Sequence, residues 1–420
     1  MAFLRSIPCA SSYQPRIGHS GRVRNYNESL TRERFDLKPA VAGLICAAVV
    51  LSWWCLKVYG SHGGNWTALY CTGSRPGMPD VIRAEGAYVF AGSHGYDSQF
   101  YHYIAHDPWL TRGFLSAVDN PPLRWRRILV SALAWTLAAG RDDWIDPAFY
   151  LVVLGCVFAG GFWLARYFRI RGSPAWWGLL FLFSPATLVV FDRIVVDVAL
   201  TALVCGFLYY AQTGRRAALW TVLAAAVAVR ETGLLLLAGW CLWLALRREL
   251  RQTIWFSAAG LPALAWWLYV ARSTPAYGMP DWGVSWPPAR LVAAILNPAR
   301  YPAPDWGNYL LTALDYLALT GTVLAIALAA RAAWRAEGPL RYAIPAFGAF
   351  GFLLTGTASV DVFQDVFSHG RLLSPLTLLV AAEGLPRRDW LSLAPILPAA
   401  LRIGILHAVL MLRIACAWPP

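Results

Sequence analysis

Residues 39–59 read PAVAGLICAAVVLSWWCLKVY, and Lys57 is the only charged residue among them. An apolar run of about 20 residues is long enough to cross a lipid bilayer as an α-helix. Backbone groups inside a bilayer must be satisfied within the protein, so a chain with many such runs forms a helix bundle. The sequence therefore predicts an all-α polytopic bundle of about 10–12 transmembrane helices, although Arg402 interrupts the last run. The other runs are at 148–165, 175–191, 194–210, 254–271, 309–330, 342–358, 372–384 and 391–414.

The composition also indicates a membrane protein. Hydrophobic residues make up 58% of the 420 residues and charged residues only 14%, against roughly 25% in soluble domains. The net charge is +13, but the basic residues form short clusters between apolar runs, and only Lys38 and Lys57 are lysines. This distribution favours a role in membrane topology over nucleic-acid binding. The eight cysteines form no C-x-x-C pair, so they indicate neither a disulfide framework nor a zinc site.

The basic clusters predict which segments face the cytoplasm. Residues 1–38 are basic and lack the apolar core of a signal peptide, so we expect a cytoplasmic N-terminal tail before a transmembrane domain at 39–420. With residues 60–147 and 272–308 as large outer loops, the six inside segments carry 20 of the 36 basic residues. This assignment requires that the short apolar run at 128–140 lies at the outer interface without crossing.

Ionisable residues also lie at the expected outer tips of the helices. Two half-length apolar runs within 217–246 meet at Arg230 and Glu231, which predicts two short helices around a polar break. Charged residues inside apolar segments are rare and often functional, although a structural ion pair between these two is the alternative. Asp192 and Asp197 flank another tip, where they face the same cavity or pair with the neighbouring Arg193.

The most distinctive polar stretch is Gly95–Tyr101, read GYDSQFY, followed by residues 119–127, read DNPPLRWRR. Asp97 lies among aromatic and amide side chains, and arginines follow it about thirty residues later. A carboxylate can accept the proton of an attacking hydroxyl, and guanidiniums match the geometry of phosphate. The alternatives are a solvated or helix-capping role for Asp97 and membrane-surface anchoring for Arg124 and Arg127.

The same stretch, with Ile104-Ala105-x-Asp107-Pro108 and Arg124-x-x-Arg127-Ile128-Leu129, resembles a bacterial family of membrane glycosyltransferases with the GT-C fold. That family includes mannosyltransferase-like proteins of cell-surface glycopolymer formation. The specific resemblance covers residues 95–131, and the order of helices and loops is similar over most of the chain. The sequence departs from the family pattern at Ser98, His102 and Ser131, where the family usually has Gly, Tyr and Pro.

The resemblance implies an extracytoplasmic hexosyltransferase of the bacterial inner membrane. Such an enzyme moves a sugar, with inversion, from a polyprenyl-phosphate donor to a hydroxyl of a glycan or lipid-linked acceptor. Asp97 matches the general base, and cationic groups would stabilise the departing phosphate. Together with the helix tips, it predicts a set of substrate-binding residues: Tyr96, Gln99, Tyr101, Asp107, Asn120, Arg124, Arg127, Arg230, Glu231 and Arg371.

Other readings remain open at this stage. A glycan ligase or polymerase also uses large outer loops with arginines, whereas a transporter or flippase would carry out no chemistry. No cofactor is predicted; the alternative is a divalent metal near Asp97 and Asp107, bound by histidines, of which His102 and His106 have helical i,i+4 spacing. The same segment also contains His94, but no distinctive third ligand accompanies the pair. The Trp and Tyr residues of 282–309 are typical of an interface belt, with a lid over the site as the alternative.

Overall fold

The computed structural model of the protein describes residues 37–75, 77–276, 284–301 and 303–417. The predicted cytoplasmic tail therefore lies, up to residue 36, outside the described residues. Within the described part, regular structure is almost entirely helical, as the apolar runs predicted. Its two strands, β1 (Thr72–Gly73) and β2 (Val89–Phe90), have two residues each and pair in parallel.

Five helical segments of the described chain are long and apolar enough to cross a membrane, at 39–61, 142–170, 250–273, 305–335 and 390–416. They contain α2 (Pro39–Ser61), α7 (Ile145–Ile170), α12 (Leu250–Ser257), α13 (Leu261–Ser273), α15 (Asp305–Arg335) and α19 (Ile396–Ala417). The 3₁₀ helix η5 (Ala175–Phe183) and α8 (Pro185–Asp192) form a sixth candidate that bends by 56°. The all-α, multi-pass character of the sequence prediction is thereby supported.

The described helices that meet the criteria for a span are fewer than the predicted ten to twelve. Three predicted spans correspond to α9 (Asp197–Thr213), α16 (Leu340–Thr357) and α18 (Val366–Gly384), which are shorter or more polar. The two half-length runs form α10 (Arg216–Val229) and α11 (Gly233–Leu246), so the predicted break at Arg230 and Glu231 is present.

Helix packing explains why polar residues occur in these segments. Helix α7 packs against α2 and α9, and α15 packs against α16, α18 and α19. Arg402, which interrupts the last apolar run, lies in an unbroken α19 and is buried. Its guanidinium donates to Asp315 of α15 at 2.8 Å. An inward-facing ion pair between two helices satisfies a charge that lipid could not.

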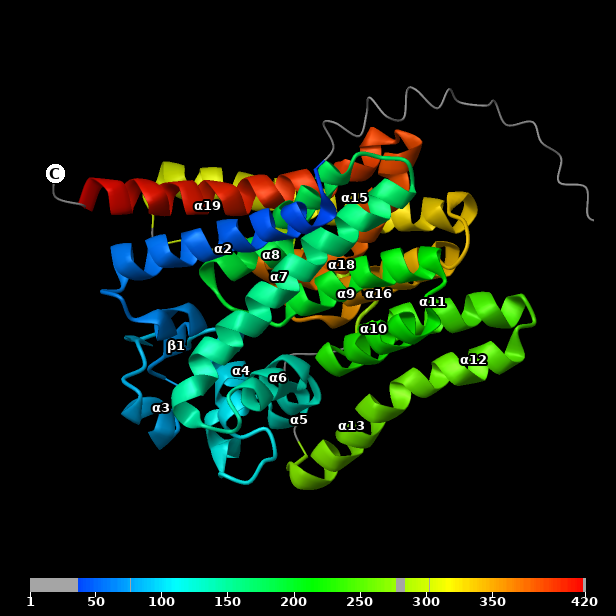
Figure 1. The fold of residues 1–420 in the computed structure, drawn as a ribbon. Helices are drawn as coiled ribbons and strands as arrows, with labels where there is room; N and C mark the ends of the chain where they lie inside the picture. The colour runs from blue at the N-terminus through cyan, green and yellow to red at the C-terminus, as the bar shows by residue number, and fades with distance from the viewer. Residues whose placement is uncertain (1–36, 76, 277–283, 302, 418–420) are drawn as a thin grey trace, which may run out of the picture. The chain divides into compact units, whose positions relative to one another are not determined.

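The first predicted outer loop folds into short elements at one end of α7, where Ile145 lies (Figure 1). They are η2 (Trp66–Tyr70), α3 (Asp80–Ala84), α4 (Asp97–His106), η3 (Phe114–Ala117), α5 (Pro121–Arg126), α6 (Leu129–Leu137) and η4 (Asp142–Trp144), besides the two strands. Helix α6 has nine residues, about 13 Å at 1.5 Å per residue, too short to cross a bilayer. It packs against α4 and α7 instead.

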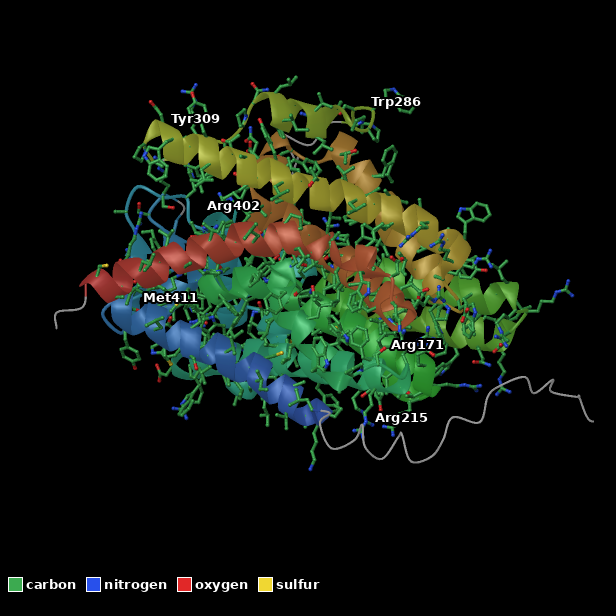
Figure 2. The ribbon with its side chains drawn as sticks, turned by 90° about the horizontal axis from the view of Figure 1, so that it is seen from above. Arg171, Arg215, Trp286, Tyr309, Arg402 and Met411 are labelled. Carbon is green, nitrogen blue, oxygen red and sulfur yellow. The ribbon has the colours of Figure 1, made fainter. Side chains whose placement is uncertain are left out.

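The remaining elements are α14 (Ala289–Leu296), α17 (Val360–Gln364) and the 3₁₀ helices η6 (Ala258–Gly260), η7 (Leu385–Arg387) and η8 (Trp390–Leu393). Figure 2 shows Trp286 and Tyr309 projecting outward, in keeping with their exposure. Arg171 and Arg215, from two predicted inside clusters, lie toward one end of the helices in the same view, and Met411 lies toward the other.

Candidate functional site

Asp97 is the first residue of α4 and is held by two arginines from different parts of the chain. Arg124 of α5 donates through Nη2 to Asp97 Oδ1 at 2.8 Å. Arg371 of α18 donates through Nη2 to Asp97 Oδ2 at 2.5 Å. The helix N-terminus adds a favourable interaction with the carboxylate. The structure therefore joins the motif of the first predicted outer loop to α18, as the predicted site requires.

The backbone before Asp97 explains how it is positioned. Gly95 has a φ of 77°, and a Cβ there would lie 2.6 Å from the backbone nitrogen of Gly73. Ser98, where the resembled family has glycine, lies inside α4 and donates to the carbonyl of Tyr70 at 2.7 Å. The left-handed conformation is thus required at Gly95, and the serine fits the helix without strain.

Arg124 is fixed by a second carboxylate. Its Nε and Nη2 donate to the two oxygens of Asp119 at 2.8 and 2.6 Å, a bidentate arrangement. The guanidinium also lies over the rings of Phe100 and Tyr101. Asn120 begins α5, where its side chain accepts from the backbone N–H of Leu123 at 3.2 Å. Planar, two-pronged contacts of this kind are the ones an arginine can also make to phosphate.

A further carboxylate, the buried Asp197 at the start of α9, extends the cluster. Arg371 donates to Asp197 through Nη1 at 3.3 Å, and Arg230 forms an ion pair with the same carboxylate. The sequence left open whether Asp197 pairs with Arg193. In the structure its carboxylate contacts Arg371 and Arg230 instead. Its neighbour Asp192 pairs instead with Lys57 and Arg193, at 2.5 and 3.1 Å.

The sequence neighbours Arg230 and Glu231 do not pair with each other as the structural alternative proposed. Glu231 accepts from Arg127 Nε at 3.0 Å, and Arg127 also contacts the hydroxyl of Tyr101 at 3.3 Å. Because the chain between α10 and α11 is not helical, the two side chains leave the break toward different partners. The break thereby supplies one cation and one anion to the cluster.

The resulting cluster contains four arginines, Arg124, Arg127, Arg230 and Arg371, and four acids, Asp97, Asp119, Asp197 and Glu231. Four of these eight side chains are buried, those of Arg124, Asp197, Arg230 and Arg371, and buried charges are tolerated only when paired. Burial alone would raise the pKa of Asp97, but Arg124 and Arg371 outweigh it and hold that pKa well below its ordinary value. Asp97 is therefore an ionised, hydrogen-bonded carboxylate at neutral pH.

Tyr96 joins the cluster through its ring, which lies 4.5 Å from the guanidinium carbon of Arg193 and 4.9 Å from that of Arg371. Three predicted substrate-binding residues have local structural partners instead. Gln99 bonds the backbone of Gly73 and His94, Asn120 caps α5, and Asp107 accepts from the backbone of Thr111 and Arg112. Their polar side chains suggested contacts with substrate. In the structure they bond the backbone of nearby loops and of a helix end, whose N–H and C=O groups also need partners.

The sequence prediction omitted two acids of the cluster from its site residues, Asp119 and Asp197. Asp119 lies within the quoted motif, five residues before Arg124, and Asp197 was noted only at a helix tip. One cavity of about 170 Å³ lies beside Arg331, Arg335 and Arg387, and a smaller one lies beside Asp315. Neither of these cavities is lined by Asp97, and the arginines and acids of the cluster contact one another directly.

The three histidines of the alternative metal site do not come together in the structure: His94 is not among the described residues that converge with His102 and His106. It lies 2.9 Å from Arg75 instead. His102 and His106 lie on the face of α4 that meets Glu85, a residue the sequence prediction did not consider. No protein-family model, curated protein or solved structure matches this chain.

Proposed function

We propose that the protein is a membrane glycosyltransferase that uses a polyprenyl-phosphate sugar, with Asp97 as general base. The observation that carries the proposal is the contact of Asp97 with both Arg124 and Arg371. Asp97 thus accepts hydrogen bonds from two guanidinium groups, which are also suited to bind a phosphate. The resemblance of residues 95–131 to GT-C glycosyltransferases favours the same chemistry.

The arginines supply the donor-binding function. A guanidinium that makes a bidentate bond to a carboxylate can make an equivalent bond to a phosphate. Arg124 and Arg371 each have a second acid, Asp119 and Asp197, so either can turn from Asp97 without losing every anionic partner. The donor phosphate would thus replace Asp97 as the ligand of these two cations.

The exchange would also activate the base. In its present ion pairs Asp97 has a lowered pKa and binds a proton weakly. When the donor phosphate takes the arginines, two opposing charges leave the carboxylate and its pKa rises toward the range useful for catalysis. Donor binding would then prepare Asp97 to accept the proton of the acceptor hydroxyl.

The transfer step balances without a cofactor. The acceptor oxygen forms a bond to the anomeric carbon while the bond from that carbon to the phosphate oxygen breaks, which inverts the configuration. The acceptor proton passes to Asp97, and the polyprenyl phosphate leaves as an anion stabilised by Arg124 and Arg371. Mannose is one candidate sugar, and the acceptor is a glycan or a lipid-linked glycan.

The predicted topology gives the site its location. Asp97 and Arg124 belong to the predicted outer loop at 60–147, and Asp197, Arg230 and Arg371 to predicted outer helix tips. With a cytoplasmic N-terminus, all would face the extracytoplasmic side of a bacterial inner membrane, where polyprenyl-linked sugars can reach them from the lipid. The finer assignment to the GT-C fold rests on the motif and on this order of elements.

The proposal is tested with purified full-length protein and a panel of polyprenyl-phosphate monosaccharides, offered with lipid-linked and free glycan acceptors. The expected result is a new glycosidic bond from one donor, formed with inversion. If the protein in sealed vesicles instead moves lipid-linked sugars across the bilayer and joins none of them, the chain is a transporter and the proposal is wrong.

A further inference from the structure

A second cluster of ionisable groups lies at the other end of α4 and takes no part in the proposed transfer. The Nε2 atoms of His102 and His106 lie 3.3 Å apart. Carboxylate oxygens of Glu85, just after α3, lie 3.4 Å from His106 Nε2 and 3.9 Å from His102 Nε2. Both histidines are almost fully buried. Three potential ligand atoms from two segments thus converge within 4.8 Å of one another.

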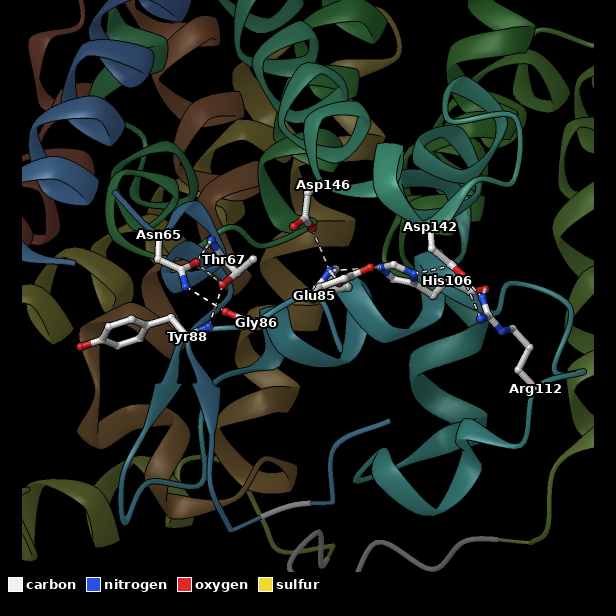
Figure 3. A network of polar contacts seen from close by, with 10 residues as sticks. Asn65, Thr67, Glu85, Gly86, Tyr88, His106, Arg112, Asp142 and Asp146 are labelled. Carbon is white, nitrogen blue, oxygen red and sulfur yellow. Dashed lines mark hydrogen bonds and ion pairs between the residues drawn. The ribbon is translucent and has the colours of Figure 1, made fainter. Parts of the chain in front are cut away.

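The orientation of His106 leaves its Nε2 free to act as a ligand. Its Nδ1 lies 2.8 Å from an oxygen of Asp142, and a carboxylate can only accept, so Nδ1 carries the proton. In the neutral ring, Nε2 then presents a lone pair to Glu85 and His102. Figure 3 shows the His106 ring between the carboxylates of Glu85 and Asp142, with Arg112 beyond Asp142.

Outer groups hold these side chains in place, as they do in metal sites. Arg112 binds both oxygens of Asp142 at 2.7 and 3.0 Å, which fixes the carboxylate that orients His106. A carboxylate bonded to the second nitrogen of a histidine is the usual outer partner of a metal ligand. His102 has no such acceptor on Nδ1 among the described residues, and its ring instead stacks on Tyr70 with 3.9 Å between centroids.

The carboxylate of Glu85 provides an independent indication that this site binds a cation. Both of its oxygens are buried, and neither accepts a hydrogen bond from any group in the described part of the chain. A buried anion without a donor is costly, and in a native protein it calls for a specific explanation such as a bound ion. The lone pair of His106 faces this carboxylate, so an ionised Glu85 receives no hydrogen bond from that nitrogen.

We infer that Glu85, His102 and His106 bind a divalent transition-metal ion of the zinc class. Imidazole nitrogens with a carboxylate are ligands typical of Zn²⁺. Tetrahedral ligands about 2.0–2.1 Å from zinc lie about 3.3 Å from one another, close to the 3.3 and 3.4 Å separations observed around His106. By the reasoning applied to His106 Nδ1, the 2.8 Å contact of His102 Nε2 with the carboxylate of Asp146 places a proton on that nitrogen, and a bound ion would displace this proton. A water molecule would take the fourth position.

The ion would join parts of the outer loop that are distant in sequence. Glu85 follows α3, and the two histidines lie on α4. Asp142 begins η4, just before α7, and Asp146 lies in the first turn of α7. Because α4 begins at Asp97, the metal would fix the helix that carries the proposed base while remaining outside the transfer step. This inference does not depend on the proposed function, since it concerns metal binding alone.

The test measures the metal directly in purified full-length protein. Inductively coupled plasma mass spectrometry should find about one zinc-class ion per chain. His102→Ala and His106→Ala should lose it, whereas His94→Ala, on an exposed histidine outside the cluster, should retain it. After removal of the metal with a chelator, Co²⁺ alone should bind and give the intense visible absorption of a four-coordinate Co²⁺ site, which the colourless Zn²⁺ form lacks.

Two conservative variants keep the test informative if the alanine variants fail to accumulate. Glu85→Gln keeps the shape of the ligand and should weaken Co²⁺ binding at least tenfold. Asp142→Asn removes the outer partner of His106 and should weaken it roughly 10- to 100-fold. Wild-type protein that holds no ion and binds no Co²⁺ would overturn the inference, leaving only a histidine–carboxylate network. Equal metal content in wild type and His106→Ala would place the ion elsewhere and overturn it as well.

Discussion

Arg371 and Asp97 are separated by 274 residues, yet the guanidinium of the first lies 2.5 Å from the carboxylate of the second. The contact connects α18, deep in the bundle, to the first turn of α4 in the predicted outer loop. Arg371 also reaches Asp197 at the start of α9. The side chain of Arg371 thus links α18, α4 and α9 around the proposed base. If a phosphate drew Arg371 away from Asp97, the contacts between these three helices would change.

The first prediction separates phosphate binding from anchoring at Arg124. Arg124→Lys keeps the charge but loses the two-pronged donor. Hydrogen bonds to charged groups contribute about 1.5–3 kcal/mol, so apparent donor affinity or turnover should fall roughly 10- to 100-fold. The measurement is steady-state transfer by purified protein with varied donor concentration.

Arg126→Lys is the matched control for this change, because Arg126 lies on the same helix and its Nε bonds only the carbonyl of Pro122. It should accumulate in the membrane and transfer sugar as wild type does. Arg127→Lys tests the contact with Glu231 and Tyr101 in the same way. Unchanged kinetics in both Arg124→Lys and Arg127→Lys would favour anchoring at the membrane surface.

The second prediction concerns pH. The two arginines lower the pKa of Asp97 well below its ordinary value of 3.8. A carboxyl whose pKa is lowered by folding contributes stability above its unfolded pKa, and this contribution is lost as pH falls through the folded pKa. The difference in thermal midpoint between wild type and Asp97→Asn should therefore be constant from pH 5 to 8. A difference that shrinks within that range would mean that Asp97 is not held by the arginines.

The third prediction concerns the sidedness of the outer loop. Asp143 follows α6 and is exposed, whereas its neighbour Asp142 is engaged with Arg112 and His106. Asp143→Cys, in a background where the exposed Cys416 is replaced by Ser, should react with a membrane-impermeant thiol reagent added outside intact cells. Labelling that requires permeabilisation would reverse the orientation proposed for the whole site.

The fold class could be predicted because the length of an apolar run, which must match the thickness of the bilayer, is read directly from neighbouring residues in the sequence. The interruption at Arg402 was ambiguous for the opposite reason, since its partner Asp315 lies 87 positions away. Fewer of the described helices than predicted pass a test of length and apolar composition, because α9, α16 and α18 pack among neighbouring helices and do not need a fully apolar sequence. The number of spans stays a prediction.

Parts of the site were predictable for a similar reason. Asp97, Arg124 and Arg127 lie in one motif of recognisable chemistry. Arg371 was expected to open a helix end, but it lies inside α18, which begins at Val366. Glu85 could not be found, because its approach to the histidines depends on how an irregular loop closes and not on any spacing. Arg230 and Glu231 were located correctly, but their partners were not, since side-chain direction at a helix break is set by the tertiary structure.

Asp97 itself carries the central claim. Asp97→Asn keeps the size of the side chain and leaves Arg124 with Asp119 and Arg371 with Asp197, so the protein should still accumulate in the membrane. Asp107→Asn, at the C-terminal end of the same helix, removes a buried carboxylate whose partners are backbone N–H groups and Thr111. It is the matched control for a purely structural loss.

The most direct measurement is the rate of sugar transfer by purified wild type, Asp97→Asn and Asp107→Asn at equal amounts of folded protein. General-base catalysis contributes roughly 10²–10⁴-fold, so Asp97→Asn should lower the rate by about that factor and Asp107→Asn much less. Near-normal transfer by Asp97→Asn, or an equal loss in the two variants, would contradict the assignment of Asp97 as the base.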